Sequence, residues 1–111
     1  MEVRPRRIEE YLTVGGKSPF GSWLQRLKDR QARVTIRKRL NRIRLGNFGD
    51  SKALGDGVHE LRVDFGPGYR VYFGRDGDTI IILLGGGTKK RQNRNIETAQ
   101  ERWKDYKRRK T

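Results

Sequence analysis

The sequence predicts a single-domain α+β protein in which an antiparallel three-stranded meander packs on two helices. Two observations carry this prediction. Residues 57–84 alternate apolar and polar side chains in short runs separated by turn signals, which is typical of adjacent strands. The segments on either side carry apolar residues at helical spacing instead. The predicted order is β-α-α-β-β-β-α, and residues 1–111 have the length of one domain.

The chain opens with an edge strand and a short helix. Residues 2–13 allow one strand, and Pro5 restricts it to the edge of the sheet. Ser18 and Pro19 predict a helix start, since serine caps helices and proline suits the first helical position. The helix ends near Asp29, and its apolar stripe is Phe20, Trp23, Leu24 and Leu27.

A second helix is predicted over residues 31–45, and it has two unlike faces. An apolar face that would sit on the sheet consists of Ala32, Ile36, Leu40 and Ile43. Arginine and lysine occupy much of the rest, and no acid occurs between Asp29 and Asp50. Solvated helices usually mix both signs. We therefore expect a face that follows phosphates or an acidic partner through Arg33, Arg37 and Arg44, the alternative being an ordinary solvated face.

The central hairpin is predicted from residues 58–65 and 69–74, joined by Gly66-Pro67-Gly68. A three-residue loop would place Phe65 opposite Tyr69 and Leu61 opposite Phe73 on the apolar face. On the polar face the same register pairs Asp64 with Arg70 and Arg62 with Tyr72. A slip of one residue would bury charge, whereas a slip of two would keep both faces.

The third strand, residues 79–84, follows the hairpin signal Asp76-Gly77 and is apolar on both faces, so both should be covered. Gly85-Gly86-Gly87 then predicts a flexible turn that leads into Lys89, Lys90 and Arg91. A crossing segment, residues 51–56, should bring Lys52 near the sheet. The last helix should begin at Asn93 or Asn95 and end in a frayed basic tail, residues 107–111. Its stripe would cover Ile81 and Leu83 with Ile96, Ala99, Trp103 and Tyr106.

The composition narrows the function classes. Lysine and arginine number 27 against 13 acids, a formal net charge of +14 that suits a polyanionic partner. The absence of cysteine and the single histidine exclude disulfides, thiolate metal sites and ordinary zinc ligation, so no cofactor is expected. With no long apolar run and no apolar signal core, we expect a soluble cytoplasmic protein that does not enter membranes.

Several motifs together resemble a known superfamily. They are Gly46-Asn47-Phe48-Gly49-Asp50, Gly57-Val58-His59-Glu60-Leu61-Arg62, Gly66-Pro67-Gly68-Tyr69-Arg70-Val71-Tyr72, and Leu83-Leu84-Gly85-Gly86-Gly87-Thr88-Lys89 with Gln92. This string resembles the RelE/ParE superfamily of toxins from type II toxin–antitoxin modules, and looks closest to the addiction module killer (HigB-like) subgroup. The resemblance implies a microbial RNase-like fold, an antitoxin that is commonly a helix-turn-helix protein, and cleavage of messenger RNA, often on the ribosome.

The resemblance also implies roles for single residues. Arg70 matches the strand arginine that stabilises the scissile phosphate in RNA-cleaving members, and Arg62 matches a basic position on the preceding strand. Lys89 falls where those members place a cation after the glycine of the last strand. Their C-terminal tyrosine or histidine, which acts as acid or base, has no clear counterpart in Gln92-Asn93-Arg94-Asn95.

RNA cleavage without metal needs a base, an acid and charge stabilisation. Tyr72 shares the face of the arginines, which would lower its pKa, whereas His59 points away and is interpreted as structural. The predicted catalytic residues are Arg62, Arg70, Tyr72 and Lys89, and the predicted RNA contacts are Arg33, Arg37, Arg44, Lys52, Lys90 and Arg91.

The leading prediction is a metal-independent endoribonuclease toxin. It should be held inactive by a cognate antitoxin whose acidic segment neutralises the basic site. The alternatives are a ParE-like toxin that poisons gyrase without nuclease activity, and a non-catalytic basic module that binds RNA or the ribosome.

Overall fold

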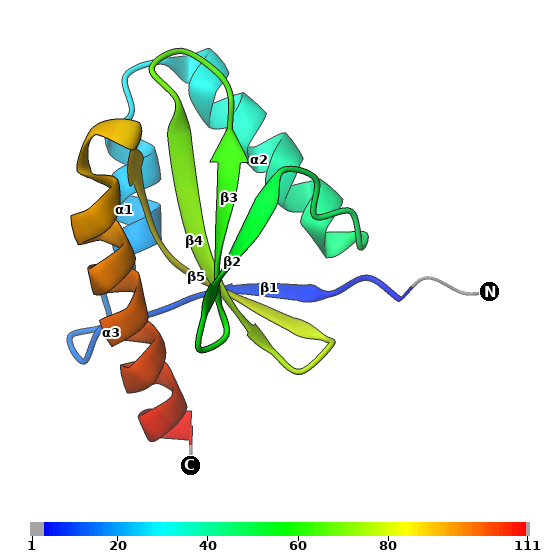
Figure 1. The fold of residues 1–111 in the computed structure, drawn as a ribbon, viewed down its shortest axis with the longest axis vertical. Coiled ribbons are helices and arrows are strands. Elements are labelled where there is room, and N and C mark those ends of the chain that lie inside the picture. Colours follow the sequence, from blue (N-terminus) through cyan, green and yellow to red (C-terminus); the bar gives the residue numbers. More distant parts are fainter. Residues whose placement is uncertain (1–3, 111) are drawn as a thin grey trace.

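A five-stranded sheet organises the molecule, and the computed structural model describes it over residues 4–110. The elements in chain order are β1 (Arg7–Glu10), α1 (Pro19–Arg26), α2 (Arg30–Arg44), β2 (Ser51–Gly55), β3 (Val58–Val63), β4 (Tyr69–Asp76), β5 (Ile80–Thr88), the short 3₁₀ turn η1 (Lys89–Arg91) and α3 (Gln92–Lys110) (Figure 1). The strand order is β1-β5-β4-β3-β2, with β1 parallel to β5 and the other pairs antiparallel. This confirms the α+β class, and it adds β2 to the predicted meander.

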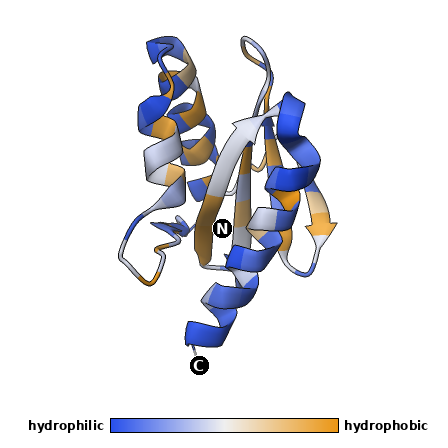
Figure 2. Ribbon diagram, turned by 90° about the vertical axis from the view of Figure 1, so that its left-hand side faces the viewer, coloured by the Kyte–Doolittle hydropathy of each residue, from blue (hydrophilic) through white to orange (hydrophobic). Residues whose placement is uncertain are grey.

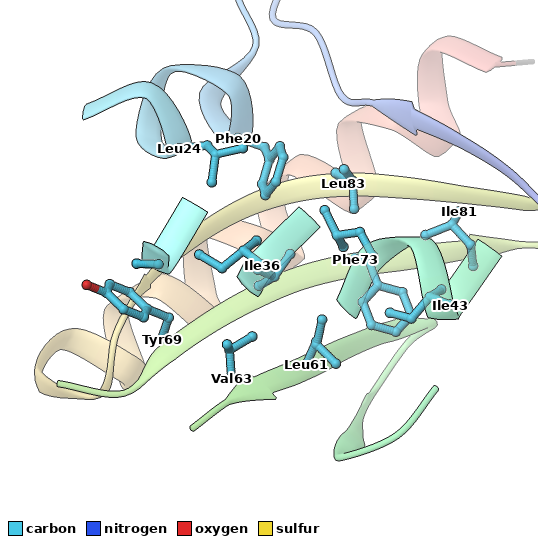
Figure 3. Close-up of a cluster of buried hydrophobic side chains, with 13 residues drawn as sticks. Phe20, Leu24, Ile36, Ile43, Leu61, Val63, Tyr69, Phe73, Ile81 and Leu83 are labelled. Atoms are coloured by element: carbon cyan, nitrogen blue, oxygen red, sulfur yellow. The ribbon is translucent and has the colours of Figure 1, made fainter. Parts of the chain in front are cut away.

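The helices cover opposite faces of the sheet (Figure 2). On one side α1 and α2 close a core whose sheet half comes from alternate residues of three strands (Figure 3). The buried residues of this first core include Leu61, Val63, Val71, Phe73, Ile81 and Leu83 from the sheet, and Phe20, Leu24, Ile36 and Ile43 from the helices. The predicted apolar faces of both helices are therefore confirmed.

Local sequence explains where these two helices begin. The hydroxyl of Ser18 accepts a hydrogen bond from the Gly21 amide at 2.9 Å, and proline occupies the first turn, as predicted. The carboxylate of Asp29 caps α2 by accepting from the amide of Gln31 at 2.9 Å. Each cap satisfies amide groups that the first helical turn leaves without a partner.

The opposite face of the sheet carries a smaller core under α3. Val58, Tyr72, Ile82 and Leu84 contribute the sheet side, and Ala99 and Trp103 the helix side. The prediction that this helix covers Ile81 and Leu83 is wrong, because those two side chains face α1 and α2. Because β5 is apolar on both faces, its sequence does not reveal which of its alternating residues face α3 and which face α1 and α2.

The C-terminal helix is longer than expected. Residues 107–110, predicted to fray, are helical, and the Nζ atom of Lys110 lies 2.5 Å from Asp76 of β4. Thr111 and the first residues of the predicted N-terminal strand lie outside the described residues. Within residues 4–110 the longest helices are too polar to cross a bilayer.

Two strand predictions also need correction. Arg62 pairs with Arg70 and Leu61 with Val71, a shift of two residues that keeps the predicted faces. The loop therefore spans residues 64–68, where the Gly68 amide donates to the Phe65 carbonyl at 3.0 Å. The segment Gly85-Gly86-Gly87 is part of β5 and pairs with β4, so the predicted flexible turn is wrong.

Candidate functional site

Four polar or charged side chains of β3 and β4 point to the sheet face that α3 partly covers. They are Glu60, Arg62, Arg70 and Tyr72, and their positions alternate with the apolar residues of the first core. The register places Arg62 beside Arg70 and Glu60 beside Tyr72. Lys52 of β2 lies on the other side of Glu60, so the predicted approach of this lysine to the sheet is confirmed.

Glu60 is the centre of the site, and its side chain is fully buried. The Nε2 amide of Gln92, at the start of α3, donates to both carboxylate oxygens at 3.1 and 2.9 Å. The Nε atom of Arg62 donates to the same carboxylate at 3.4 Å, and that of Arg70 lies 3.8 Å away. We call these four residues, Glu60, Arg62, Arg70 and Gln92, the Glu60 cluster.

The cluster exposes its cations and hides its anion. A buried carboxylate is stable only with charged or hydrogen-bonding partners, and Glu60 has both kinds. The side chain of Arg62 is 39% exposed and that of Arg70 is 11% exposed, whereas Glu60 has no exposed surface. The buried Nε of Arg70 has no hydrogen-bond partner among residues 4–110. An incoming anion would therefore meet guanidinium groups that the carboxylate holds in place.

Tyr72 does not have the environment that the sequence suggested. Burial is the main cause that raises its pKa, and the neighbouring charge of Glu60 adds to the effect, while Arg70 opposes it only weakly. The prediction of a lowered pKa is therefore wrong, because burial outweighs the arginine. The hydroxyl is a hydrogen-bond donor at neutral pH. The Glu60 carboxylate lies near enough to help raise its pKa, but no acceptor within the described residues meets full hydrogen-bond geometry.

Other predicted residues divide between the two sides of the sheet. Lys89, Lys90 and Arg91 form η1, are exposed, and follow the end of β5 that pairs with Arg70 through Gly87. The α2 arginines do not join them, because α2 covers the opposite face. Of the α2 set, Arg33 donates to the Leu27 carbonyl, and Arg37 and Arg44 are exposed.

His59 is placed as predicted, and Asp64 is not. The His59 ring stacks on Phe73 of the first core with 5.2 Å between ring centroids. Burial, followed by the charge of Arg75, lowers the pKa of this histidine. Asp64 lies exposed in the loop after β3, and the expected pair with Arg70 is replaced by the pair of Arg70 with Glu60.

Sequence reasoning missed Glu60 and Gln92 as parts of the site. Glu60 carried a signal, since it lies two residues before Arg62 on the polar face of the hairpin; Asp64, two residues after Arg62, carried the same signal. Gln92 belongs to the motifs that carry the family resemblance, but its contact with Glu60 has no local signal, because it depends on how a helix 32 residues later in the chain docks. Within residues 4–110 no three histidine or acidic side chains are grouped as metal ligands.

Comparisons with known proteins match the part of the chain that forms this site. Residues 22–104 match the family described as "Phage derived protein Gp49-like (DUF891)". A Haemophilus influenzae protein described only as "Uncharacterized protein" is 46% identical over 81 residues, which covers 73% of this chain and 82% of that relative. The Gp49-like family is toxin-like and related to RelE/HigB-type toxins. The chain that presents the Glu60 cluster therefore belongs to the Gp49-like family.

Proposed function

We propose that this chain is the HigB-like toxin of a toxin–antitoxin pair and that it cleaves messenger RNA without a metal ion. The observation that carries this proposal is the Glu60 cluster, in which two arginines from paired strands surround one buried carboxylate. Such a site offers fixed positive charge to a phosphate while keeping its own negative charge away from it. The formal net charge of +14 favours an RNA substrate over neutral ligands.

The proposed reaction is an internal transfer within the RNA. The 2′-oxygen bonds to the neighbouring phosphorus, the bond from phosphorus to the 5′-oxygen breaks, and the products are a 2′,3′-cyclic phosphate and a 5′-hydroxyl end. A base takes the 2′-hydroxyl proton, and an acid gives a proton to the leaving 5′-oxygen. Negative charge builds on the phosphate oxygens in between.

Arg62 and Arg70 are proposed to stabilise that charge. Preorganised donors of this kind contribute roughly 10²–10³ in rate each, by analogy with oxyanion holes. Glu60 has no exposed surface, so its proposed role is to position the two guanidinium groups. Lys52 pairs with Glu60 in the register of the sheet, and Lys89 begins η1 directly after β5. Both lysines are exposed, and we assign the proton transfers to them.

A second candidate is a toxin that poisons gyrase without cutting RNA. One observation favours it. Tyr72 is buried with a raised pKa, and Gln92 supplies an amide at the start of α3, so neither provides a group that exchanges protons near neutral pH. The cluster would then bind a partner surface and perform no chemistry.

Induction of the chain in a bacterial host, followed by primer extension of abundant messengers, separates these candidates. The nuclease proposal expects discrete new 5′ ends together with growth arrest. Arg70→Ala should abolish both, and the variant should remain folded by circular dichroism because Arg70 lies outside the apolar cores. Arg7→Ala is the matched control, since this arginine is 71% exposed on β1.

Other outcomes contradict the nuclease proposal. Intact messengers with an induced SOS response would point to gyrase. A folded Arg70→Ala variant that still cuts RNA at the wild-type rate would remove the Glu60 cluster from the mechanism. The proposed partner is tested separately, through tight co-purification with an acidic protein from a neighbouring gene. Their association should slow as salt rises, because opposite charges steer the encounter.

A further inference from the structure

A second basic site lies beside the Glu60 cluster, at the open edge of β5. Strand β1 pairs with residues 80–83 of β5, and the Tyr11 amide makes the last contact, to the Leu83 carbonyl at 2.9 Å. Beyond that point no strand of the described chain covers Gly85, Gly86 and Gly87 on this side. Helices α1 and α3 flank the uncovered edge, and a cavity of about 260 Å³ lies between them.

The glycines bring the walls of this cavity close to the strand. A Cβ atom on Gly86 would lie 2.3 Å from the Trp23 ring of α1, and one on Gly85 would lie 2.6 Å from the Arg102 guanidinium of α3. A side chain at Gly86 would push Trp23 and α1 away, whereas one at Gly85 would displace the end of the Arg102 side chain. The glycine run that sequence patterns assign to a turn therefore forms the floor of a pocket.

The pocket is strongly cationic. Four arginines line it, Arg26 from α1, Arg91 from η1, and Arg94 and Arg102 from α3, and no acid is among the lining residues. None of the four forms an ion pair within residues 4–110. Arg102 donates one hydrogen bond to the Leu84 carbonyl at 2.8 Å, but no carboxylate within residues 4–110 neutralises any of the four guanidinium groups, so the cavity favours a ligand with more than one negative charge.

Tyr72 gives the pocket an unpartnered buried donor. Only 1% of this residue is exposed, it lines the cavity, and its hydroxyl has no hydrogen-bond partner in the described chain. Buried hydroxyl groups without partners are uncommon, because leaving one unsatisfied costs about 1–3 kcal/mol. A phosphate oxygen in the pocket would supply the missing acceptor.

The pocket also has an apolar wall, formed by Pro19, Trp23 and Ala99. Its volume is slightly below the range of roughly 300–1,000 Å³ found for drug-sized ligands. A free phosphate ion would leave that wall without contact, whereas a sugar and a base would cover it. The pocket therefore combines the two chemistries of a nucleotide.

We propose that this arginine pocket binds the phosphate of a nucleotide, either a free nucleoside phosphate or the phosphorylated 5′ end of an RNA. Binding in this pocket requires no RNA cleavage at the Glu60 cluster. The two sites have no residue in common, although Tyr72, which lines the pocket, pairs with Glu60 in the register of the sheet. Failure of one proposal is therefore distinguishable from failure of the other.

The test is calorimetric titration of the full chain at about 0.15 M salt, the physiological ionic strength. Three ligands are compared: adenosine 5′-monophosphate, adenosine, and inorganic phosphate. We expect the monophosphate to bind at least tenfold more tightly than either of the others. Short RNAs with and without a 5′-phosphate then identify the source, since preference for the phosphorylated RNA over the monophosphate assigns the pocket to RNA ends.

Matched variants locate the binding. The double variant R26Q/R94Q should weaken monophosphate binding at least tenfold, because it removes two exposed charges that hold no part of the fold. K38Q/R42Q removes the same charge from α2 on the opposite face, and it should leave the affinity unchanged. Tyr72→Phe should weaken binding severalfold while the variant remains folded.

Three results overturn the proposal. They are equal binding of adenosine and its monophosphate, equal losses in R26Q/R94Q and K38Q/R42Q, and no binding of any phosphorylated ligand. A loss of RNA cleavage in Arg70→Ala with unchanged monophosphate binding would support two separate sites.

Discussion

The two faces of the sheet are built from the same strands and differ in almost every physical respect. Toward α1 and α2, β3 and β4 present mainly apolar or aromatic groups. The exceptions are the His59 ring and Arg75, whose guanidinium lies 4.5 Å from the centre of the Phe48 ring. Toward α3, alternate positions of the same strands carry Glu60, Arg62, Arg70 and Tyr72. The larger apolar core lies on the α1 and α2 side, so we infer that burial on that side contributes most of the hydrophobic stabilisation. The α3 side can therefore carry charged residues.

Neighbouring residues of β4 give the largest test of this difference. Phe73 is fully buried in the first core, so Phe73→Ala should lower the free energy of unfolding by about 3–5 kcal/mol. Tyr72→Phe on the other face should not lower it, and should raise it by up to about 1–3 kcal/mol, because it removes a buried hydroxyl that has no partner. Urea unfolding measures both values. Similar losses for the two variants would contradict the division of labour.

Glycine substitutions compare how a helix docks on each face. A Cβ atom on Gly74 would lie 2.3 Å from the Trp103 ring of α3, and one on Gly86 would lie equally close to the Trp23 ring of α1, at 2.3 Å. Each alanine substitution should cost about 1–3 kcal/mol through overpacking. Gly15→Ala meets only an ordinary contact at 3.9 Å, so it serves as the control. The fluorescence of the displaced tryptophan should shift to the red.

Acid should loosen the α3 face before the other. Hydrogen bonds from Lys110 and Tyr106 lower the pKa of Asp76, and bonds from Tyr11 and Arg108 lower that of Asp105. A lowered folded-state pKa gives stability that is present above the ordinary value of about 3.9 and lost as the pH falls through the folded value. Trp103 fluorescence in a Trp23→Phe background should therefore change below about pH 4.

Two variants check the origin of that acid transition. Asp76→Asn should make the Trp103 signal less dependent on pH, because it removes one of the two titrating anchors. Trp23 fluorescence in a Trp103→Phe background should stay constant over the same range. If both tryptophans respond together, the sheet unfolds as one unit and the α3 face has no separate acid step.

The smallest expected effect concerns the exposed arginines of α2. Arg37→Glu with Arg44→Glu should leave the unfolding free energy nearly unchanged, since both residues are exposed. If this face follows RNA, the slope of log affinity against log salt should fall by roughly 0.7–0.9 for each lost phosphate contact. The same exchange at Arg7 and Lys17 is the control. An unchanged slope would confine RNA to the α3 side.

Alternation and helical spacing predicted most of the fold. The faces of the hairpin, the apolar stripes and the Ser18 cap of α1 follow from local sequence, because each depends on residues a few positions apart. The Asp29 cap of α2 was not predicted, and the last helix begins at Gln92 and not at Asn93 or Asn95. The hairpin register was missed by two residues, since Gly66-Pro67-Gly68 suggests a shorter loop and both registers keep the same faces. Strand β2 was missed because it is only five residues long and its polar and apolar residues do not alternate.

The site was less predictable than the fold, for physical reasons. The alternation of β3 and β4 predicted that Arg62 and Arg70 lie on the same face of the sheet. The burial of Glu60 beside them was not predictable in this way, because it involves a hydrogen bond from Gln92 of a distant helix. The run Gly85-Gly86-Gly87 predicts a flexible turn, because glycine favours turns. In the structure they are strand residues. Glycine fits there because the side chains of Arg102, Trp23 and Asn95 pack directly against the strand, and local propensity does not reveal such contacts.

The pairing of β1 with β5 has a consequence for how the protein is made. Residues 7–10 are synthesised early, yet their partners are residues 80–83, with both N-terminal helices and three strands in between. Contacts between such distant segments form slowly, because a long loop must close first. On the ribosome the sheet therefore stays unfinished until most of the chain has emerged.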